Sequence, residues 1–277
     1  MRSRAVAGNA DTTVEGRAVS SRSRLSLSFI PALTVVASLV ALGLLWEVVA
    51  NAWQNRALPT PFAVWRTLAA EAVGGDLFYN LGATLGRVAA AYIVAMVIGS
   101  AIGTFLGLSR RANRFFNPWL ILFLNIPALV VIVLAYIWFG LNETAAVGAV
   151  AVNKIPNVVV VMREGARALN PAYTDLAAVY RFGWADRLRH VMMPQLQPFL
   201  AAASRTGIAL IWKIVLVVEL LGRSNGVGFQ IGVYFQLFDV AGILAYTFAF
   251  AAVMLAVEFL MVQPLERHAT RWRRRTA

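Results

Sequence analysis

Charged side chains inside long apolar runs are the residues of this sequence best placed to do chemistry. Lys154 lies near the middle of one such run, and Lys213 near the middle of another that also holds Glu219. In a membrane-spanning helix a charge costs about 2.5–3.5 kcal/mol on insertion scales, so it usually has a function. Two interpretations stay open. In the first, Lys154 or Lys213 lines a translocation pathway and attracts an anion, with Glu219 as a further pathway candidate. In the second, Lys154 or Lys213 forms an interhelical ion pair with Glu219.

The residue types also exclude several chemistries. The chain has no cysteine, which rules out thiolate catalysis, disulfides and iron–sulfur clusters. Its two histidines, His190 and His268, lie in basic polar segments, so a histidine metal or haem site inside an apolar run is excluded. Neither lysine follows a glycine, so no phosphate-binding loop of the Gly-Lys-Ser/Thr type exists. We therefore expect no catalytic, cofactor or metal site, and any ATP hydrolysis would need another chain.

A charged block, "DLAAVYRFGWADRLRHVMMPQLQP" (residues 175–198), lies between apolar runs. Pro171 suits the first turn of a helix, "RFG" interrupts it, and Trp184, Leu188 and Met192 continue on one apolar face. The pattern predicts a helix–turn–helix on the membrane surface. Three roles compete: an amphipathic anchor, a docking element for a cytoplasmic partner, and a DNA-binding motif. The last is disfavoured because the block is short and tethered at both ends.

The elements around these residues indicate an integral membrane protein. Only 14% of the 277 residues are charged, against roughly 25% in soluble domains, and apolar runs of about 20 residues recur. The expected fold is all-α, with six transmembrane helices and the helix–turn–helix between the fourth and fifth. The expected spans are 28–53, 81–108, 116–139, 145–162, 199–221 and 241–262.

Prolines predict where the helices break, and glycines predict where helices pack closely. Pro127 predicts a kink or break in the third span, and Pro194 and Pro198 predict a stop or kink before the fifth. Short surface helices are expected within residues 54–78 and 222–240. Small residues four apart let helix backbones approach closely in lipid. This spacing predicts a packing face, preferably within one bundle, at Gly99, Gly103 and Gly107.

The arginines indicate the topology. With six spans, 19 of the 23 arginines lie on one side, which predicts that both termini are cytoplasmic. Residues 1–27 are expected to be a disordered basic tail, 28–262 the membrane domain, and 263–277 a second basic tail. The net charge of +12 is then explained by membrane flanks rather than by nucleic-acid binding.

The charged block resembles the cytoplasmic loop signature of permease subunits of bacterial ABC importers. Asp175 stands for its acid, Ala177 for one of its two alanines, and Pro194 for its proline. The position of its glycine holds Arg181, and the chain's own glycine, Gly183, comes two residues later. A non-glycine residue in a left-handed turn costs roughly 1–2 kcal/mol. An alternative alignment on Gly183 fits less well, because Ala177 then occupies the position of the acid.

Four further segments resemble segments of the nitrate/sulfonate/taurine/bicarbonate permease family. They occur in the same order as in that family, and the resemblance covers about residues 28–262. They are "LPTPFAVWRTL", "LGLSRRANRFFNPWL", "NIPALVVIVLAYIWFGLNE" and "VVELLGRSNGVGFQI". The resemblance implies a permease subunit of the bacterial inner membrane that imports a small anionic solute of nitrate, sulfonate, taurine, bicarbonate or aromatic carboxylate type. It also implies two ATPase subunits, an extracytoplasmic solute-binding protein that selects the solute, and a second permease copy. The ATPase-coupling residues would be Asp175, Ala177, Arg181, Gly183, Arg187, Arg189 and Pro194.

The main alternative is a secondary transporter or channel without an ATPase. Such proteins usually contain two inverted halves with paired broken helices. Here Pro127 and Pro156 lie in adjacent rather than corresponding spans, and this alternative leaves the charged block unexplained. An intramembrane protease is weaker still, because neither histidine lies at membrane depth.

Overall fold

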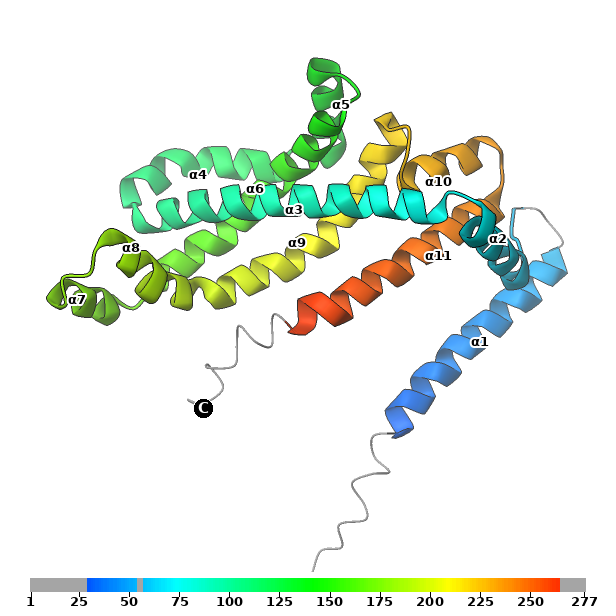
Figure 1. Ribbon diagram of the computed structural model, residues 1–277, viewed down its shortest axis with the longest axis horizontal. Coiled ribbons are helices and arrows are strands. Elements are labelled where there is room, and N and C mark those ends of the chain that lie inside the picture. The colour runs from blue at the N-terminus through cyan, green and yellow to red at the C-terminus, as the bar shows by residue number, and fades with distance from the viewer. Residues whose placement is uncertain (1–28, 54–56, 265–277) are drawn as a thin grey trace, which may run out of the picture. The chain divides into compact units, whose positions relative to one another are not determined.

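A computed structural model describes residues 29–53 and 57–264, which form helices and turns with no strand in these ranges (Figure 1). The chain divides into two units, residues 1–52 and 53–277. The described part of the first unit is helix α1 (Phe29–Trp53) as far as Ala52. The predicted tails lie outside the described residues, except for Gln263 and Pro264.

The second unit is a succession of helices that matches the predicted apolar runs and both predicted surface helices. They are α2 (Pro61–Gly74), α3 (Leu77–Leu108), α4 (Arg110–Asn125), α5 (Ala128–Phe139), α6 (Glu143–Arg167), α7 (Pro171–Val179), α8 (Trp184–Asp186), the π-helical η2 (Arg187–Met192), α9 (Met193–Gly222), α10 (Val227–Gln236), α11 (Val240–Val257) and the π-helical η3 (Glu258–Val262). The all-α prediction is therefore confirmed.

The predicted number of six spans is not confirmed. In the described ranges, four helical stretches are long and apolar enough to cross a membrane: α3, α6, the continuous stretch Trp184–Gly222, and Val240–Leu260. The pair α4 and α5 counts as a fifth if it is one span, although the two helices meet at an angle of 94°. The apolar part of α1, Ala37–Trp53, is shorter than these stretches.

Proline breaks the chain at one predicted place and not at another. Pro127 interrupts the third span, because a proline has no N–H to donate and its ring collides with the preceding helical turn. It becomes the N-cap of α5 with ψ 135°, and its carbonyl accepts a hydrogen bond of 3.0 Å from the Val130 N–H. Of the predicted stop or kink at Pro194 and Pro198, the stop is wrong, since the helix continues through both. The wider π turns of η2 directly precede Pro194 and relieve its conflict with the earlier carbonyl.

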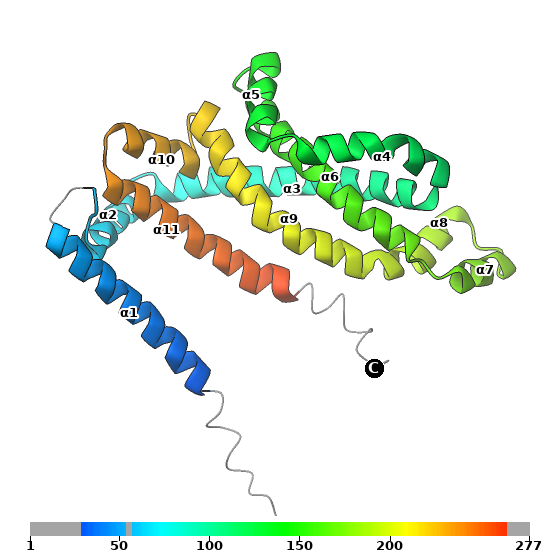
Figure 2. The same cartoon turned by 180° about the vertical axis from the view of Figure 1, so that it is seen from behind.

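The centre of the second unit is formed by α3, α6 and α9, which contact one another (Figure 2). The glycines of α3 make the closest approach, to α6. A methyl group added at Gly103 would lie 2.7 Å from both Met162 Cβ and the Val159 carbonyl oxygen, and one at Gly107 would lie 2.5 Å from Ala166 Cβ. Gly99 meets Val158 of α6 in the same way. The stripe of small residues therefore packs within one chain.

Helix α2 is held against α10 and α11 by hydrogen bonds to one carboxylate, that of Glu71. The hydroxyls of Tyr234 on α10 and Tyr246 on α11 each donate a hydrogen bond of 2.8 Å to Glu71 of α2. Burial, together with the bond to Glu71, raises the pKa of Tyr234 above its ordinary value, so this hydroxyl stays a donor at all physiological pH values. The predicted surface helix is thus tied to the bundle by two specific bonds.

Replacing Gly103 by alanine is expected to lower the free energy of unfolding by about 1–3 kcal/mol, because the added methyl overpacks the α3–α6 contact. Gly82→Ala on the same helix is the matched control, since a methyl group there meets nothing within 4 Å. The control is expected to stabilise the chain by up to about 1 kcal/mol through helix propensity. Thermal unfolding of the purified full chain in detergent measures both, and equal effects would contradict the packing role of Gly103.

Candidate functional site

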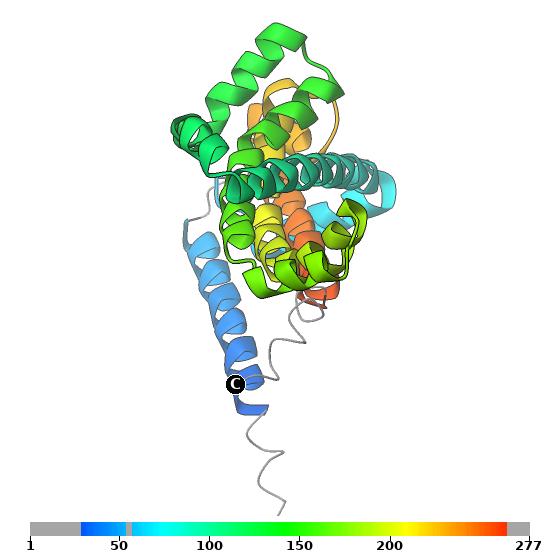
Figure 3. The ribbon, with the colours of Figure 1, turned by 90° about the vertical axis from the view of Figure 1, so that its left-hand side faces the viewer.

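The charged block lies at the end of the bundle where α6 ends and α9 begins, termed here the loop end (Figure 3). Helix α7 starts as the sequence dictates: the Asn170 side chain accepts a 3.0 Å hydrogen bond from the Ala172 N–H, and Pro171 occupies the first turn. Asp175 is exposed on α7, whereas Ala177 is buried against the rest of the block. The acid of the signature therefore faces outward.

The turn between the two helices of the block centres on Arg181. Arg181 has φ +51°, in the left-handed region, whereas Gly183 has φ −63° and precedes α8. The left-handed residue is thus at the position that the preferred alignment assigns to the signature glycine. Arg181 bears the conformational cost that a glycine would avoid, about 1–2 kcal/mol. A hydrogen bond of 2.9 Å from the Phe182 N–H to the Ala177 carbonyl oxygen stabilises this turn.

The outer surface of the block combines arginines with large apolar side chains. Arg181, Arg187 and Arg189 are all exposed. Tyr180 and Trp184 beside them are also exposed, at 69% and 79%. A surface with exposed aromatic residues and arginines has the composition that protein interfaces favour.

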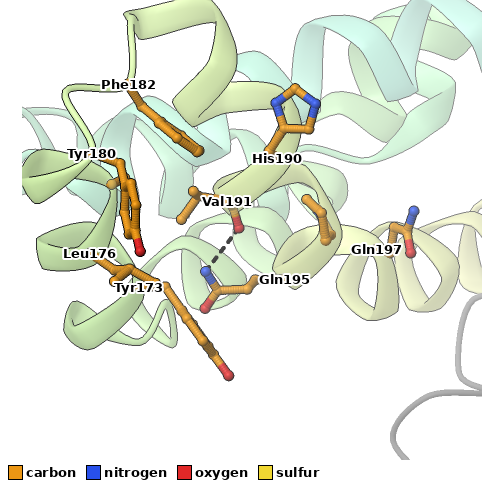
Figure 4. A pocket seen from close by; sticks show the side chains of 10 residues that line it. Tyr173, Leu176, Tyr180, Phe182, His190, Val191, Gln195 and Gln197 are labelled. Atoms are coloured by element: carbon orange, nitrogen blue, oxygen red, sulfur yellow. Dashed lines mark hydrogen bonds between the residues drawn. The ribbon is translucent and has the colours of Figure 1, made fainter.

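A hollow of about 630 Å³ lies between α7 and the start of α9 (Figure 4). It is lined mainly by apolar side chains, and the lining residues are Tyr173, Leu176, Ala177, Tyr180, Phe182, His190, Val191, Pro194, Gln195 and Gln197. Gln195 holds its two walls together: it donates to the Val191 carbonyl at 2.9 Å and accepts from the Asn170 N–H at 2.9 Å. The hollow is large enough to receive side chains of another protein.

At the opposite end of the bundle, four charged side chains meet, and two of them, Arg87 and Glu219, are buried. Arg87 of α3, 6% exposed, binds Glu219 of α9, 0% exposed, through an Nη1–Oε1 contact of 2.6 Å. It also binds Glu143 at the start of α6 through two parallel bonds of 2.7 and 2.8 Å. Arg223 joins the same carboxylate at 2.5 Å. These four residues, termed here the Arg87 network, tie three helices to one another.

The Arg87 network also fixes the glycine-rich loop that follows α9. Arg87 donates to both the backbone and side-chain oxygens of Asn225. The other Glu219 oxygen accepts 2.9 Å hydrogen bonds from the Thr84 hydroxyl and from the Gly228 N–H. Because Gly228 belongs to the first turn of α10, Glu219 satisfies a free N–H at a helix N-terminus, where a negative charge is favourable. The loop and α10 are thereby held against α3 and α9.

The predicted ion pair between a lysine and Glu219 is wrong: the partner of Glu219 is Arg87. Lys154 is 2% exposed and lies between α3 and α9, with its Cε 3.4 Å from the point where a Gly207 Cβ would be. Within the described ranges it has no carboxylate or hydrogen-bond partner. Lys213 is exposed on α9, with its Nζ 5.4 Å from the centre of the Trp212 ring.

The Arg87 network was not predicted as a unit from the residue pattern. The sequence did contain a signal for it: Arg87 and Glu219 are both charged residues in apolar runs, where a charge needs a partner. Choosing the right pairs required the fold. Among the described residues, no group of three or more histidines and carboxylates could hold a metal ion.

Residues 95–271 match the family described as binding-protein-dependent transport system inner membrane component. The chain is also 27% identical over 231 residues to the protein named an aliphatic sulfonates transport permease, SsuC, of Bacillus subtilis (strain 168), covering 83% of each chain. It is 25% identical over 235 residues to the bicarbonate transport system permease protein CmpB of Synechococcus elongatus, covering 80% of this chain and 84% of the relative. The taurine transport system permease protein TauC of Escherichia coli (strain K12) is 24% identical over 196 residues, covering 71% of each.

Among solved structures, the fold resembles the inward-facing MetNI methionine ABC transporter, with a TM-score of 0.61. The likeness covers 72% of this chain and 98% of that chain at 15% identity. The helical arrangement described above is therefore one that an ABC transporter chain adopts.

Replacing Arg87 by methionine is expected to lower the free energy of unfolding by about 3–5 kcal/mol, because Glu219 is left as a buried, unpaired carboxylate. The double variant Arg87→Met with Glu219→Met is expected to recover much of this loss, since neither buried charge remains. Arg66→Met, an exposed arginine on α2, is the control. Thermal unfolding in detergent distinguishes the cases, and an Arg87→Met protein as stable as the control would contradict the structural role of the network.

Proposed function

Because the chain belongs to the family of binding-protein-dependent transport system inner membrane components, we propose that it works as one of two permease copies that together import a small anionic solute. It is a permease subunit of a binding-protein-dependent ABC importer, a multi-pass membrane protein and not itself an enzyme. The solute, the partners and the stoichiometry are our proposals. Two ATPase subunits would bind at the loop end, and a solute-binding protein at the opposite end.

The exposed surface of α7, α8 and η2 is the observation that carries the ATPase part of the proposal. It bears the signature acid Asp175, exposed arginines and exposed aromatic residues, beside an apolar hollow of about 630 Å³. A membrane anchor would need its apolar side chains turned toward lipid only. Here the hollow also opens between the two helices, which supports insertion of side chains from a soluble partner. The loop end would then be cytoplasmic, as the arginine bias also predicts.

One continuous helical stretch connects this surface to the opposite end of the bundle, which supports coupling through the surface. Helix α8, η2 and α9 form one helical stretch from Trp184 to Gly222, so a displacement of the block is transmitted along α9. At its far end α9 carries Glu219, which is bonded to α3 and to the α10 N-terminus. Closure of an ATPase pair would thus rock the far end of the bundle as a unit, an alternation between two packings.

The proposal of an anionic solute rests on Lys154 and on the relatives. Lys154 is a buried amine without a carboxylate partner in the described part of the chain, and a positive charge on it would be costly unless that charge has a function. The relatives are named for sulfonates, bicarbonate and taurine, all of which carry an anionic group. We propose that Lys154 draws this group into the pathway, with Lys213 on the exposed side of α9 as a second attractive charge.

Asp175→Ala and Arg187→Ala are each expected to reduce co-purification of the cognate ATPase by about ten-fold or to abolish ATP hydrolysis stimulated by the binding protein. The physical reason is loss of a charged contact at a docking surface, where truncation of one partner costs about 2 kcal/mol or more. Pull-down of the solubilised complex and ATPase assays in liposomes measure the two effects.

The control for this experiment is Arg66→Ala, an exposed arginine on a helix remote in sequence from the block. Unaltered docking and coupling in both block variants would reduce the block to a membrane anchor. If no ATPase binds even the unmodified chain, the alternative of a transporter without an ATPase takes precedence.

Lys154→Met is expected to leave the amount of protein in the membrane unchanged, because the substitution removes a buried charge that has no carboxylate partner to leave behind. Uptake of radiolabelled taurine, alkanesulfonate or bicarbonate, whichever the unmodified transporter carries, is expected to fall by about ten-fold or more. Lys154→Arg keeps the charge and is expected to retain more uptake. Loss of the protein itself in Lys154→Met would show that the lysine is structural.

A further inference from the structure

A second basic surface at the loop end is not used by the proposed function. It surrounds a hollow of about 530 Å³ between the last turns of α3 and α6 and the first turns of α4. The lining residues are Leu106, Gly107, Arg110, Asn113, Arg114, Asn117, Pro118, Arg163 and Arg167. Four arginines from two helices therefore converge on one cavity, termed here the basic hollow.

The arginines of the basic hollow are oriented and incompletely neutralised. Arg163 is held in place by the side-chain oxygens of Asn117, at 2.8 Å, and Asn113, at 3.3 Å. Glu164 is the only carboxylate bonded to them in the described part of the chain, with one oxygen 3.2 Å from both Arg163 and Arg167. Arg110 and Arg114 have no ion-pair partner among the described residues. Four positive charges thus face one negative charge.

The N-terminus of α4 adds to this positive potential. This helix has 16 residues and begins at Arg110, where its first N–H groups carry the positive end of the helix dipole. Guanidinium groups in this setting bind phosphate through two parallel hydrogen bonds. The chemistry of the basic hollow is therefore that of an oxyanion site, with a phosphate group as the best match.

An apolar hollow adjoins the basic one and indicates where the phosphate comes from. It has a volume of about 420 Å³ and is lined only by apolar side chains of the same three helices, namely Ile102, Phe105, Leu106, Phe116, Trp119, Leu120, Phe123, Val152, Ile155, Pro156 and Val159. Leu106 lines both hollows. On α3 and α6 the apolar lining lies farther from the loop end than the basic lining, and on α4 it extends beyond the basic lining as far as Phe123, so the apolar hollow reaches deeper along the bundle.

This order of charge and apolar surface is that of an anionic phospholipid. We propose that the two hollows form one binding site for such a lipid, with the phosphate among Arg110, Arg114 and Arg167 and an acyl chain along Phe105, Trp119 and Ile155. Basic pockets between membrane helices on the cytoplasmic side are known to suit anionic head groups. A free phosphate would use the basic hollow but gain nothing from the apolar one. The bound lipid would link α4 to α6, and α6 is followed directly by the charged block.

The test measures lipid retention by the purified full chain with native mass spectrometry. Phosphatidylglycerol is expected to be retained in preference to phosphatidylcholine. The double variant Arg110→Gln with Arg114→Gln is expected to bind phosphatidylglycerol about twenty-five-fold more weakly, since each arginine contributes roughly five-fold. The matched control is Arg111→Gln with Arg66→Gln, which removes the same charge from exposed positions that do not line the hollow. Equal retention by the two double variants would overturn the proposal.

Two further measurements distinguish the lipid from other occupants. Ile102→Trp fills the apolar hollow without touching an arginine and is expected to reduce retention of phosphatidylglycerol at an unchanged unfolding temperature. If retention is unaffected, and millimolar inorganic phosphate displaces the lipid, the site takes free phosphate and the lipid assignment is wrong. Because the chain has no cysteine, Trp119→Cys gives a single thiol on this face. Efficient disulfide cross-linking of two copies through it would show that a second copy covers the face instead.

Discussion

The buried ion pair between Arg87 and Glu219 is the interaction on which the ordered end of this bundle depends. Two charges are removed from water there, and each is compensated by several bonds: Arg87 reaches Glu143 and Asn225, and Glu219 reaches Thr84 and Gly228. In a medium of low dielectric constant such a pair is strong only while both partners are present. The same bonds close the loop after α9 and orient α10. One electrostatic contact thus sets the relation of α3, α6, α9 and α10.

The charged block at the loop end differs, because its charged side chains are not buried in the bundle. Its charges are exposed, its aromatic side chains are not covered, and one backbone position, Arg181, is held in a conformation that L-residues disfavour. Such features are expensive in an isolated chain and are consistent with a surface completed by a partner. The bundle therefore has one end where buried charges are paired within the chain and one end that is open to other molecules. The continuous stretch from Trp184 to Gly222 connects the two.

The small-residue face of α3 makes the pair formed by α3 and α6 stiff. Gly99, Gly103 and Gly107 let α3 lie against α6 with the backbones almost in contact, so neither helix can slide without a collision. The broken pair α4 and α5 stands in contrast, because the chain changes direction by 94° at Pro127. A stiff pair of helices beside a bent one is a suitable arrangement for a rigid-body motion, in which packed elements move as units and the bends absorb the change.

The sequence by itself determined the membrane class, the order of the helices, the break at Pro127, the surface helices and the turn at Arg181. These depend on hydropathy, proline chemistry and spacing, all of which act over a few neighbouring residues. Tertiary structure alone decided the partner of Glu219, since Arg87 is 132 positions away in sequence and either lysine was an equally plausible base. It also decided that the helix passes through Pro194, because π turns relieve the clash, and that arginines of α4 and α6 meet in one hollow. Pairing and cavities arise from distances in space, which local sequence patterns do not encode.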